Sequence, residues 1–201
     1  MFPRRPSNSR TSPSAMQHPV CTDYLAAKGF AYVETAVRAQ RVAIIGTHFQ
    51  AGKGERERRV CQQQMQQLRA FIDRRVSPMI DVVILAGDLN VDFGSDEYDD
   101  MLSILRAEAP AVTKSNQGWK SWDPSTNTFL QSRVPNASPT HVDYVLVLEG
   151  NGNAVRHAVR SRTVRVLANA DGSPFDLSDH HAVLGTVTTT SRRQSTWRRT
   201  A

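Results

Sequence analysis

Residues 82–90 read Val-Val-Ile-Leu-Ala-Gly-Asp-Leu-Asn, and they decide how the rest of the chain is interpreted. The apolar run predicts a buried strand, yet it ends on Asp88 and Asn90, a carboxylate and a carboxamide. Residues two apart in a strand point to the same side, so this pair could bind a divalent cation or orient a phosphate at a sheet edge. A plain turn is the alternative, because Asp and Asn also favour turns.

Further polar clusters follow other apolar runs, at Thr47-His48, His141-Val142-Asp143 and Ser178-Asp179-His180. A histidine, with an ordinary pKa of about 6.5, suits general-base catalysis on water, and a partner carboxylate usually fixes its tautomer. Asp143 could be that partner for His180. Only one of the adjacent His180 and His181 should point into the site. His48 could donate to a phosphoryl oxygen, although a lone histidine is more often a structural hydrogen-bonding group.

The remaining pattern alternates strands and helices and predicts a mixed α/β fold. The expected elements are a hairpin of Phe30–Val37 and Arg41–Phe49, a helix over Glu55–Val76, a strand over Asp81–Ala86, a helix N-capped by Ser95, and strands over Val142–Leu148, Val155–Leu167 and Ala182–Val187. Residues 113–140 are polar and contain Trp119 and Trp122. A long ordered loop of this kind often borders a site.

The length of the chain limits the number of domains it can form, and the distribution of charge indicates what the domain can bind. A chain of 201 residues can form one domain with a real core. Residues 1–20 are rich in proline and polar residues, and residues 190–201 are similarly polar, so we expect disordered tails around one domain at 21–189. The net charge is +6, but the arginines of the two tails contribute +7, which leaves −1 on the domain. This distribution argues against specific binding of nucleic acid.

The two cysteines permit at most one intrachain disulfide. Cys61 falls on a helical apolar stripe with Met65 and Leu68, which favours a buried thiol, and a disulfide between Cys21 and Cys61 is left open. Residues 1–20 contain no apolar leader segment, and no stretch approaches the roughly 20 apolar residues of a membrane span.

Taken together, the polar clusters resemble the downstream motifs of the endonuclease/exonuclease/phosphatase superfamily, which has the deoxyribonuclease I-like fold. The stretches that carry the resemblance are Thr47-His48-Phe49-Gln50, Gly87-Asp88-Leu89-Asn90, His141-Val142-Asp143-Tyr144 and Ser178-Asp179-His180. Two further stretches, Lys28-Gly29-Phe30 and Trp122-Asp123-Pro124, are similar to secreted neutral sphingomyelinases, the sphingomyelinase C branch. The resemblance covers about residues 21–188 and implies an α/β (α+β) β-sandwich flanked by helices.

The resemblance implies a hydrolase that cleaves the phosphodiester of sphingomyelin to ceramide and phosphocholine, with Mg²⁺ or another divalent cation as cofactor. It assigns His180 as the general base that activates water and Asp143 as the residue that orients it. Asp88 binds phosphate and the metal region together with Asn90. His48 stabilises the pentavalent oxyanion or assists the leaving group.

Two more positions receive roles from the same resemblance. Asp179 is implied in the metal or phosphate shell, beside Asp88 as a metal ligand. Trp122 is implied in substrate binding together with Asn90. The implied partners are sphingomyelin or a related phospholipid and, peripherally, a membrane surface, with no specific nucleic acid. Relatives of that branch are secreted, but no signal peptide is visible here, so the compartment is left open.

The chain departs from the superfamily in one important respect. The superfamily's first half supplies an early asparagine and a glutamate that is the main metal ligand, and nothing in this chain corresponds to that glutamate. Glu34, Glu55 and Glu57 are interpreted as exposed charges. We therefore expect the N-terminal half of the domain to be absent, with a partner chain as one substitute for it. Without an upstream segment carrying such a glutamate, we expect negligible phosphodiesterase activity from the 201 residues.

Two other functions stay open at this stage. One is a nuclease or other phosphodiesterase of the same fold, and the other is a catalytically inactive fragment or binding module. The near-neutral domain and the Trp122-Asp123-Pro124 context count against a nuclease, whereas the missing glutamate directly favours the inactive alternative. Whether the chain is an active enzyme is therefore left open.

Overall fold

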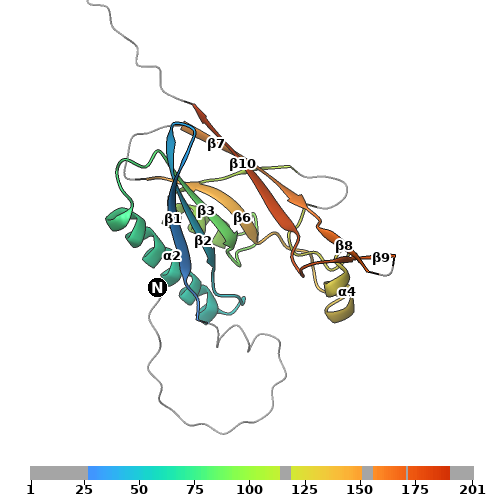
Figure 1. Cartoon of the computed structure of the whole chain (residues 1–201). Helices are drawn as coiled ribbons and strands as arrows, with labels where there is room; N and C mark the ends of the chain where they lie inside the picture. The colour runs from blue at the N-terminus through green and yellow to red at the C-terminus, as the bar shows by residue number, and fades with distance from the viewer. Residues whose placement is uncertain (1–26, 114–118, 151–155, 171, 191–201) are drawn as a thin grey trace, which may run out of the picture.

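The computed structural model describes residues 27–113, 119–150, 156–170 and 172–190. Its main sheet has five strands in the order β1-β2-β3-β6-β4 (Figure 1). These strands are β1 (Phe30–Val37), β2 (Gln40–His48), β3 (Val82–Asp88), β6 (Asp143–Leu148) and β4 (Ala107–Glu108). Strands β2 and β3 run parallel, while β3 and β6 run antiparallel.

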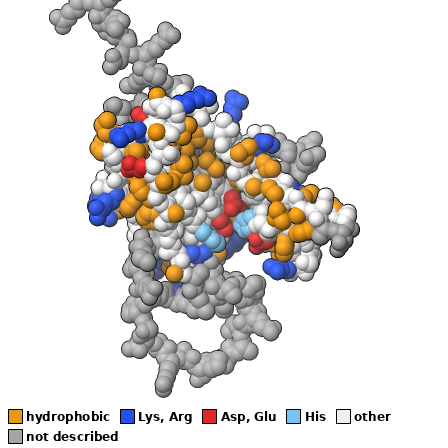
Figure 2. Space-filling view, in the orientation of Figure 1, with side chains coloured by type: hydrophobic (Ala, Val, Ile, Leu, Met, Phe, Trp, Pro, Cys, Tyr) orange, Lys and Arg blue, Asp and Glu red, His pale blue; other side chains and the backbone are white. Residues whose placement is uncertain are grey.

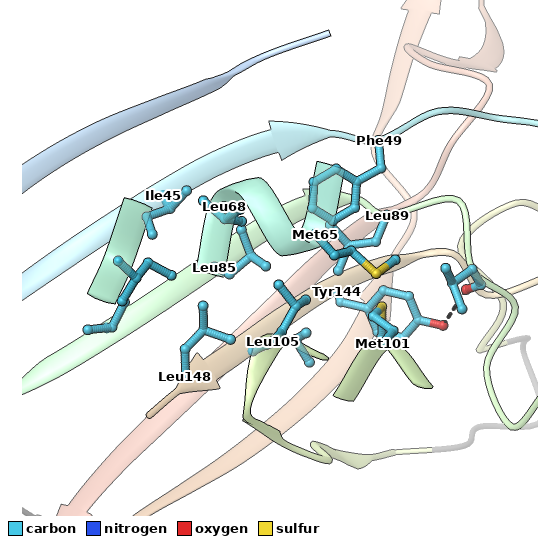
Figure 3. Packing of buried hydrophobic residues seen from close by; sticks show 14 of the residues in the cluster. Ile45, Phe49, Met65, Leu68, Leu85, Leu89, Met101, Leu105, Tyr144 and Leu148 are labelled. Atoms are coloured by element: carbon cyan, nitrogen blue, oxygen red, sulfur yellow. Dashed lines mark hydrogen bonds between the residues drawn. The ribbon is translucent and has the colours of Figure 1, made fainter. Parts of the chain in front are cut away.

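Helices α2 (Glu55–Arg75) and α3 (Asp96–Leu105) cover one face of this sheet. The expected periodicity is confirmed, because α2 buries Cys61, Met65, Leu68 and Ile72 against strand residues such as Ile45 and Leu85. Figure 3 shows this packing together with Met101 and Leu105 of α3. Ser95 caps α3 as expected, since its hydroxyl accepts a hydrogen bond from the backbone N–H of Tyr98.

The opposite face of the main sheet meets a second sheet in the order β10-β7-β5. These strands are β7 (Arg156–Val164), β10 (Ala182–Thr190) and β5 (Ala111–Val112). A small apolar cluster joins the sheets through Val42, Val82, Val147 and Val159. The sheets approach closely at Gly185, where an added Cβ would lie 2.5 Å from the side chain of Val145. This arrangement is the β-sandwich flanked by helices that the family resemblance implies.

The second sheet covers only part of that face. Val33 of β1 is 53% exposed and its cross-strand neighbour Ile44 of β2 is 37% exposed. Figure 2 shows hydrophobic side chains gathered over β1 and β2 on this side of the molecule. The outer part of the β1–β2 hairpin therefore has an apolar surface that the described residues leave open to solvent.

Several elements differ from the sequence predictions. The expected strand over Val155–Leu167 is instead β7, which ends at Val164, followed by a separate two-stranded sheet of β8 (Leu167–Ala170) and β9 (Ser173–Asp176). The expected polar loop contains a short helix, α4 (Thr128–Arg133), which Asn127 caps through its side-chain oxygen. Residues 1–20 and 191–201 lie outside the described residues, as does Cys21.

Cys61 is a buried free thiol, as its position on the helical stripe predicts. Its sulfur donates to the backbone carbonyl of Leu89, at 3.7 Å. Burial raises the pKa of the thiol to about 12, and the nearby carboxylates of Glu97 and Asp88 act in the same direction. This thiol is therefore protonated at neutral pH.

No described helix has the length and apolarity that crossing a membrane requires.

Asp176 joins α4 to the β8–β9 hairpin. Its carboxylate accepts two hydrogen bonds from the Arg165 guanidinium, each 2.7 Å long, and two more from the N–H and hydroxyl of Thr128. The side chain is almost completely buried. The Arg165 hydrogen bonds outweigh burial and hold the pKa of Asp176 far below its usual range. An ionised carboxylate is thus part of the fold in this region.

Replacing Gly87 by alanine should strongly destabilise the protein. Gly87 has a φ of +146°, and an added Cβ would lie 1.9 Å from the backbone oxygen of Thr47 on the neighbouring strand. We expect Gly87→Ala to lower the free energy of unfolding by about 3 kcal/mol or more, measured by urea denaturation. Gly94→Ala is the control, because Gly94 also has a positive φ but no atom lies within 4 Å of the added Cβ. Equal losses in the two variants would contradict the steric explanation.

Replacing Asp176 by asparagine should make the free energy of unfolding less sensitive to acidic pH. A carboxylate whose folded pKa is depressed contributes stability above its ordinary pKa of about 3.9, and this contribution is lost as the pH falls through the folded pKa. We expect Asp176→Asn to cost about 2–4 kcal/mol at neutral pH in urea denaturation, with the difference shrinking below about pH 4. Asp100→Asn, at an exposed position on α3, should change stability by less than about 0.5 kcal/mol. A pH-independent cost of Asp176→Asn would count against the ionised network.

Candidate active site

A hydrogen-bonded histidine–carboxylate pair occupies the centre of the site. The Nδ1 atom of His180 lies 2.7 Å from Oδ2 of Asp143, the first residue of β6. An ionised carboxylate only accepts hydrogen bonds, so Nδ1 carries the proton in this contact. The other ring nitrogen, Nε2, faces Asp88 Oδ2 at 3.9 Å, which is too long for a direct hydrogen bond. In the neutral ring, Nε2 therefore presents a lone pair to the space in front of Asp88.

Strand register places the other site residues beside this pair. Asp88 is paired with His48 of β2 on one side and with Asp143 of β6 on the other. The Nε2 atom of His48 lies 3.4 Å from Asp88 Oδ2. One ligand atom each from Asp88, Asp143 and His180 lies within 4.8 Å of the others. The ends of three adjacent strands thus bring His48, Asp88 and Asp143 together beside His180, which precedes β10 (Ala182–Thr190).

The residue that follows each of these strand ends is an anchor in the core. Phe49, Leu89 and Tyr144 come directly after His48, Asp88 and Asp143, and all three are buried. Figure 3 shows Phe49, Leu89 and Tyr144 packed near Met65 and Met101. The Tyr144 hydroxyl also donates to the Val91 carbonyl at 2.7 Å. His48, Asp88 and Asp143 are therefore each held by a packed neighbour rather than by a free loop.

The charges of the site shift the pKa values of its groups. Burial by itself lowers the pKa of His180, but the hydrogen bond and charge of Asp143, aided by Asp88 and Asp179, outweigh burial and raise it. Burial raises the pKa of Asp88, and the neighbouring Asp143 carboxylate raises it further. Two carboxylates at this spacing repel each other and would also repel a phosphodiester. Both effects would be relieved by a bound cation.

The donor set fits a divalent cation. Mg²⁺ prefers oxygen ligands and is commonly held by one or two carboxylates, which Asp88 and Asp143 supply side by side. The predicted metal ligand Asp179 is exposed, and its carboxylate lies 3.5 Å from the Ser178 hydroxyl, outside the cluster of possible ligands. Its role in a metal shell stays a prediction. No glutamate is part of that cluster in the described portion of the chain.

Asn90 does not follow the strand geometry assumed from the sequence. Strand β3 ends at Asp88, and Asn90 has a left-handed backbone with a φ of +53°. Its backbone N–H donates to Asp88 Oδ1 at 2.9 Å, and its side-chain NH₂ donates to the Phe49 carbonyl at 3.0 Å. The argument that residues two apart share one side of a strand was therefore wrong here, and the turn alternative describes the backbone. Asn90 still lies beside Asp88.

His181 and Trp122 lie next to the site without joining the cluster. His181 is buried, its Nε2 lies 3.1 Å from the Thr126 hydroxyl, and its backbone N–H donates to the Ser121 carbonyl. Of the two adjacent histidines, only His180 therefore joins the cluster with Asp88 and Asp143. Trp122 is half-buried and pairs through its backbone with Thr140, and its predicted role in substrate binding stays a prediction.

Sequence reasoning missed the residues that hold these segments together. Ser121 accepts hydrogen bonds from the backbone of residues 142 and 143, and Asn127 donates from its side chain to the Ser178 carbonyl. The polar composition of residues 113–140 indicated a loop near the site, but no periodic pattern distinguished these two positions.

A cleft of about 330 Å³ opens beside the pair. Its polar part is lined by Asp143, Ser178, His180 and His181. The remaining wall is largely apolar, with Ala86, Val145, Val166, Leu177 and Val183. Figure 2 shows histidine and acidic side chains gathered between two groups of hydrophobic side chains. The arrangement can therefore activate a water molecule at His180 next to an apolar surface.

Comparison with known proteins agrees with this geometry. The model of the endonuclease/exonuclease/phosphatase family matches residues 10–180. Sphingomyelinase C of Listeria ivanovii is 34% identical over 175 residues, which make up 81% of this chain and 51% of that protein. The crystal structure of SmcL is similar with a TM-score of 0.68 and 33% identity, over 84% of this chain and 60% of that chain.

A crystal structure of a beta toxin variant of Staphylococcus aureus with bound magnesium ions is also similar. Its TM-score is 0.65 at 26% identity, over 79% of this chain and 57% of that chain. This chain thus spans about half of the Listeria protein and somewhat more of the two crystallised chains. The similarities confirm the expected resemblance and the deoxyribonuclease I-like α/β fold.

Removing the Asp143 charge should lower the pKa of His180. In Asp143→Asn, burial continues to lower that pKa, and only Asp88 and Asp179 still act to raise it. We expect an NMR titration of the His180 ring in metal-free buffer to show a lower pKa than in the parent protein. Asp100→Asn, remote from the pair, should leave the titration unchanged. An unaltered pKa in Asp143→Asn would contradict the assigned contact.

Proposed function

Because this chain belongs to the endonuclease/exonuclease/phosphatase family, we propose that its site hydrolyses the phosphodiester of sphingomyelin or a related phospholipid, releasing ceramide and phosphocholine from sphingomyelin. The observation that carries this proposal is the 2.7 Å contact of His180 Nδ1 with Asp143, which leaves Nε2 facing Asp88. The similarity to sphingomyelinase C of Listeria ivanovii supports the choice of substrate.

His180 acts as the general base in this proposal. Its Nε2 takes a proton from water, and the resulting hydroxide attacks phosphorus while the bond from phosphorus to the ceramide oxygen breaks. The Asp143 carboxylate keeps the proton on Nδ1 and stabilises the imidazolium that forms. The leaving oxygen must gain a proton, and His48 is placed on the other side of Asp88 to assist it.

The Asp88 carboxylate would hold a divalent cation, Mg²⁺ in the first instance, with Asp143 as the adjacent oxygen donor. The chemistry that the cation supplies when bound is polarisation of a phosphoryl oxygen and neutralisation of charge on the leaving oxygen. Burial, and after it the neighbouring Asp143 carboxylate, raise the pKa of Asp88, which supports a site that receives positive charge. Asn90 and Trp122 would contact the substrate, and Asp179 would lie in the metal or phosphate shell.

A phospholipid suits the cleft better than a nucleic acid does. Beyond His180, the wall offers Val145, Leu177 and Val183 but no lysine or arginine. Nucleic-acid sites depend on cationic side chains that neutralise successive phosphates. An apolar wall matches instead a substrate with alkyl chains, presented at a membrane surface.

One observation favours a second candidate, a metal-binding module without turnover. Within the described portion of the chain, the possible ligands beside His180 include no glutamate. Such a site would bind a divalent cation and a phosphate group yet stabilise the transition state poorly.

The assay that separates these functions measures phosphocholine release from sphingomyelin vesicles by the 201-residue chain. We expect at most slow release, close to the background rate, because the described cluster has carboxylates but no glutamate. Any release above background should require Mg²⁺ and be abolished by EDTA. His180→Ala and Asp88→Ala should each lower the rate by a factor on the order of 10³, or to the background rate. Asp100→Ala on the surface of α3 is the matched control and should retain the parent rate.

The other outcomes are equally informative. Release that persists in His180→Ala would overturn the proposed base. Mg²⁺ binding by calorimetry without any release would support the binding module. Cleavage of single-stranded DNA in preference to sphingomyelin would point to a nuclease.

A further inference from the structure

Ser121 lies next to the His180–Asp143 pair, but it belongs neither to the segment that carries His180 nor to the segment that carries Asp143. It is fully buried. A backbone bridge between Trp122 and Thr140, with hydrogen bonds of 3.0 and 2.9 Å, fixes it beside the start of β6. Ser121 therefore has a defined place next to Asp143, although it comes from the long polar loop.

The Ser121 hydroxyl oxygen binds the backbone that carries Asp143. It accepts one hydrogen bond from the N–H of Val142 at 3.0 Å and one from the N–H of Asp143 at 3.1 Å. A hydroxyl oxygen has two acceptor positions, and both are used here. The orientation of the first residue of β6 thus depends on this side chain.

The backbone carbonyl of Ser121 binds the other segment. It accepts a hydrogen bond from the N–H of His181 at 2.7 Å, directly after His180. A second contact from the same loop, from the Asn127 side chain to the Ser178 carbonyl, holds the other end of that segment at 2.8 Å. Ser121 therefore contacts the backbone of Asp143 and the backbone of His181, the residue after His180.

We infer that Ser121 is a positioning residue, whose hydroxyl and carbonyl set the distance between the Asp143 carboxylate and the His180 ring. The inference rests on the proposed function, because it assigns Ser121 to the general base of that reaction. Ser121 itself does not touch the reacting atoms. Its effect passes through Asp143, whose backbone it binds directly, and through His180, whose neighbour it binds.

The variants separate the hydroxyl from the rest of the residue. Ser121→Ala keeps the carbonyl contact with His181 but leaves the N–H groups of Val142 and Asp143 without their acceptor. Ser121→Thr keeps the hydroxyl and should rescue the effect, while Ser121→Cys replaces it with a weaker acceptor of similar shape. Ser125→Ala is the matched control, because the Ser125 hydroxyl lies in the same loop and donates to Asp123 instead.

The measurement is NMR of the whole chain without metal. The ring N–H of His180, identified by its loss in His180→Ala, should give a separate downfield signal. We expect Ser121→Ala to speed hydrogen exchange of this proton and of the Asp143 amide by about tenfold, the factor for a lost hydrogen bond of about 1.4 kcal/mol. Ser121→Thr and Ser125→Ala should exchange as in the parent.

The outcomes distinguish a positioning role from a general contribution to stability. A lower melting temperature in Ser121→Ala with an unchanged His180 signal would overturn the inference. If Ser121→Ala fails to fold, Ser121→Cys decides in the same way, since an unchanged signal there contradicts the inference and faster exchange supports it. Because NMR needs no turnover, faster exchange in a chain that releases no phosphocholine would support the positioning role and contradict the proposed function. Phosphocholine release by the parent chain, together with unchanged exchange in Ser121→Ala, would support the proposed function and contradict the positioning role.

Discussion

The pairing of β3 with both of its neighbours is the constraint on which the site depends. Parallel pairing with β2 puts His48 beside Asp88, and antiparallel pairing with β6 puts Asp143 on its other side. Because side chains alternate along a strand, a shift of one residue in either pairing would bury the polar side chains and expose the anchors that follow them. Burial of Phe49, Leu89 and Tyr144 thus specifies the register that the chemistry requires.

Gly87 shows how closely this register constrains the backbone. The parallel neighbour Thr47 presents its carbonyl where a Cβ would be, so only glycine permits β2 and β3 to pair up to their last residues. The glycine in the motif is therefore explained by packing between strands, and the following Asp88 by the proposed cation site. Two adjacent residues of one motif serve different physical purposes.

The sequence predicted those parts of the molecule that follow a regular period. The stripe from Cys61 to Ile72 predicted α2, and Ser95 predicted the start of α3, because both signals are local. Helix α4 has six residues, too few for a period to be recognised. The site was predicted as a set of residue types at strand ends, but the argument for Asn90 failed because its backbone leaves the strand geometry. Ser121 could not be predicted, since its role depends on backbone groups far along the chain.

The electrostatics of the site connect metal binding to the availability of the base. The Asp143 and Asp88 charges raise the pKa of His180, which favours the imidazolium and removes the lone pair that a general base needs. The same carboxylates repel an incoming phosphodiester. Positive charge held by Asp88 would offset both effects, because it weakens the field that keeps His180 protonated and attracts the phosphate. A site of this composition is therefore poorly suited to catalysis by its own side chains alone, and a cation bound there would act on its acid–base chemistry as well as on substrate binding.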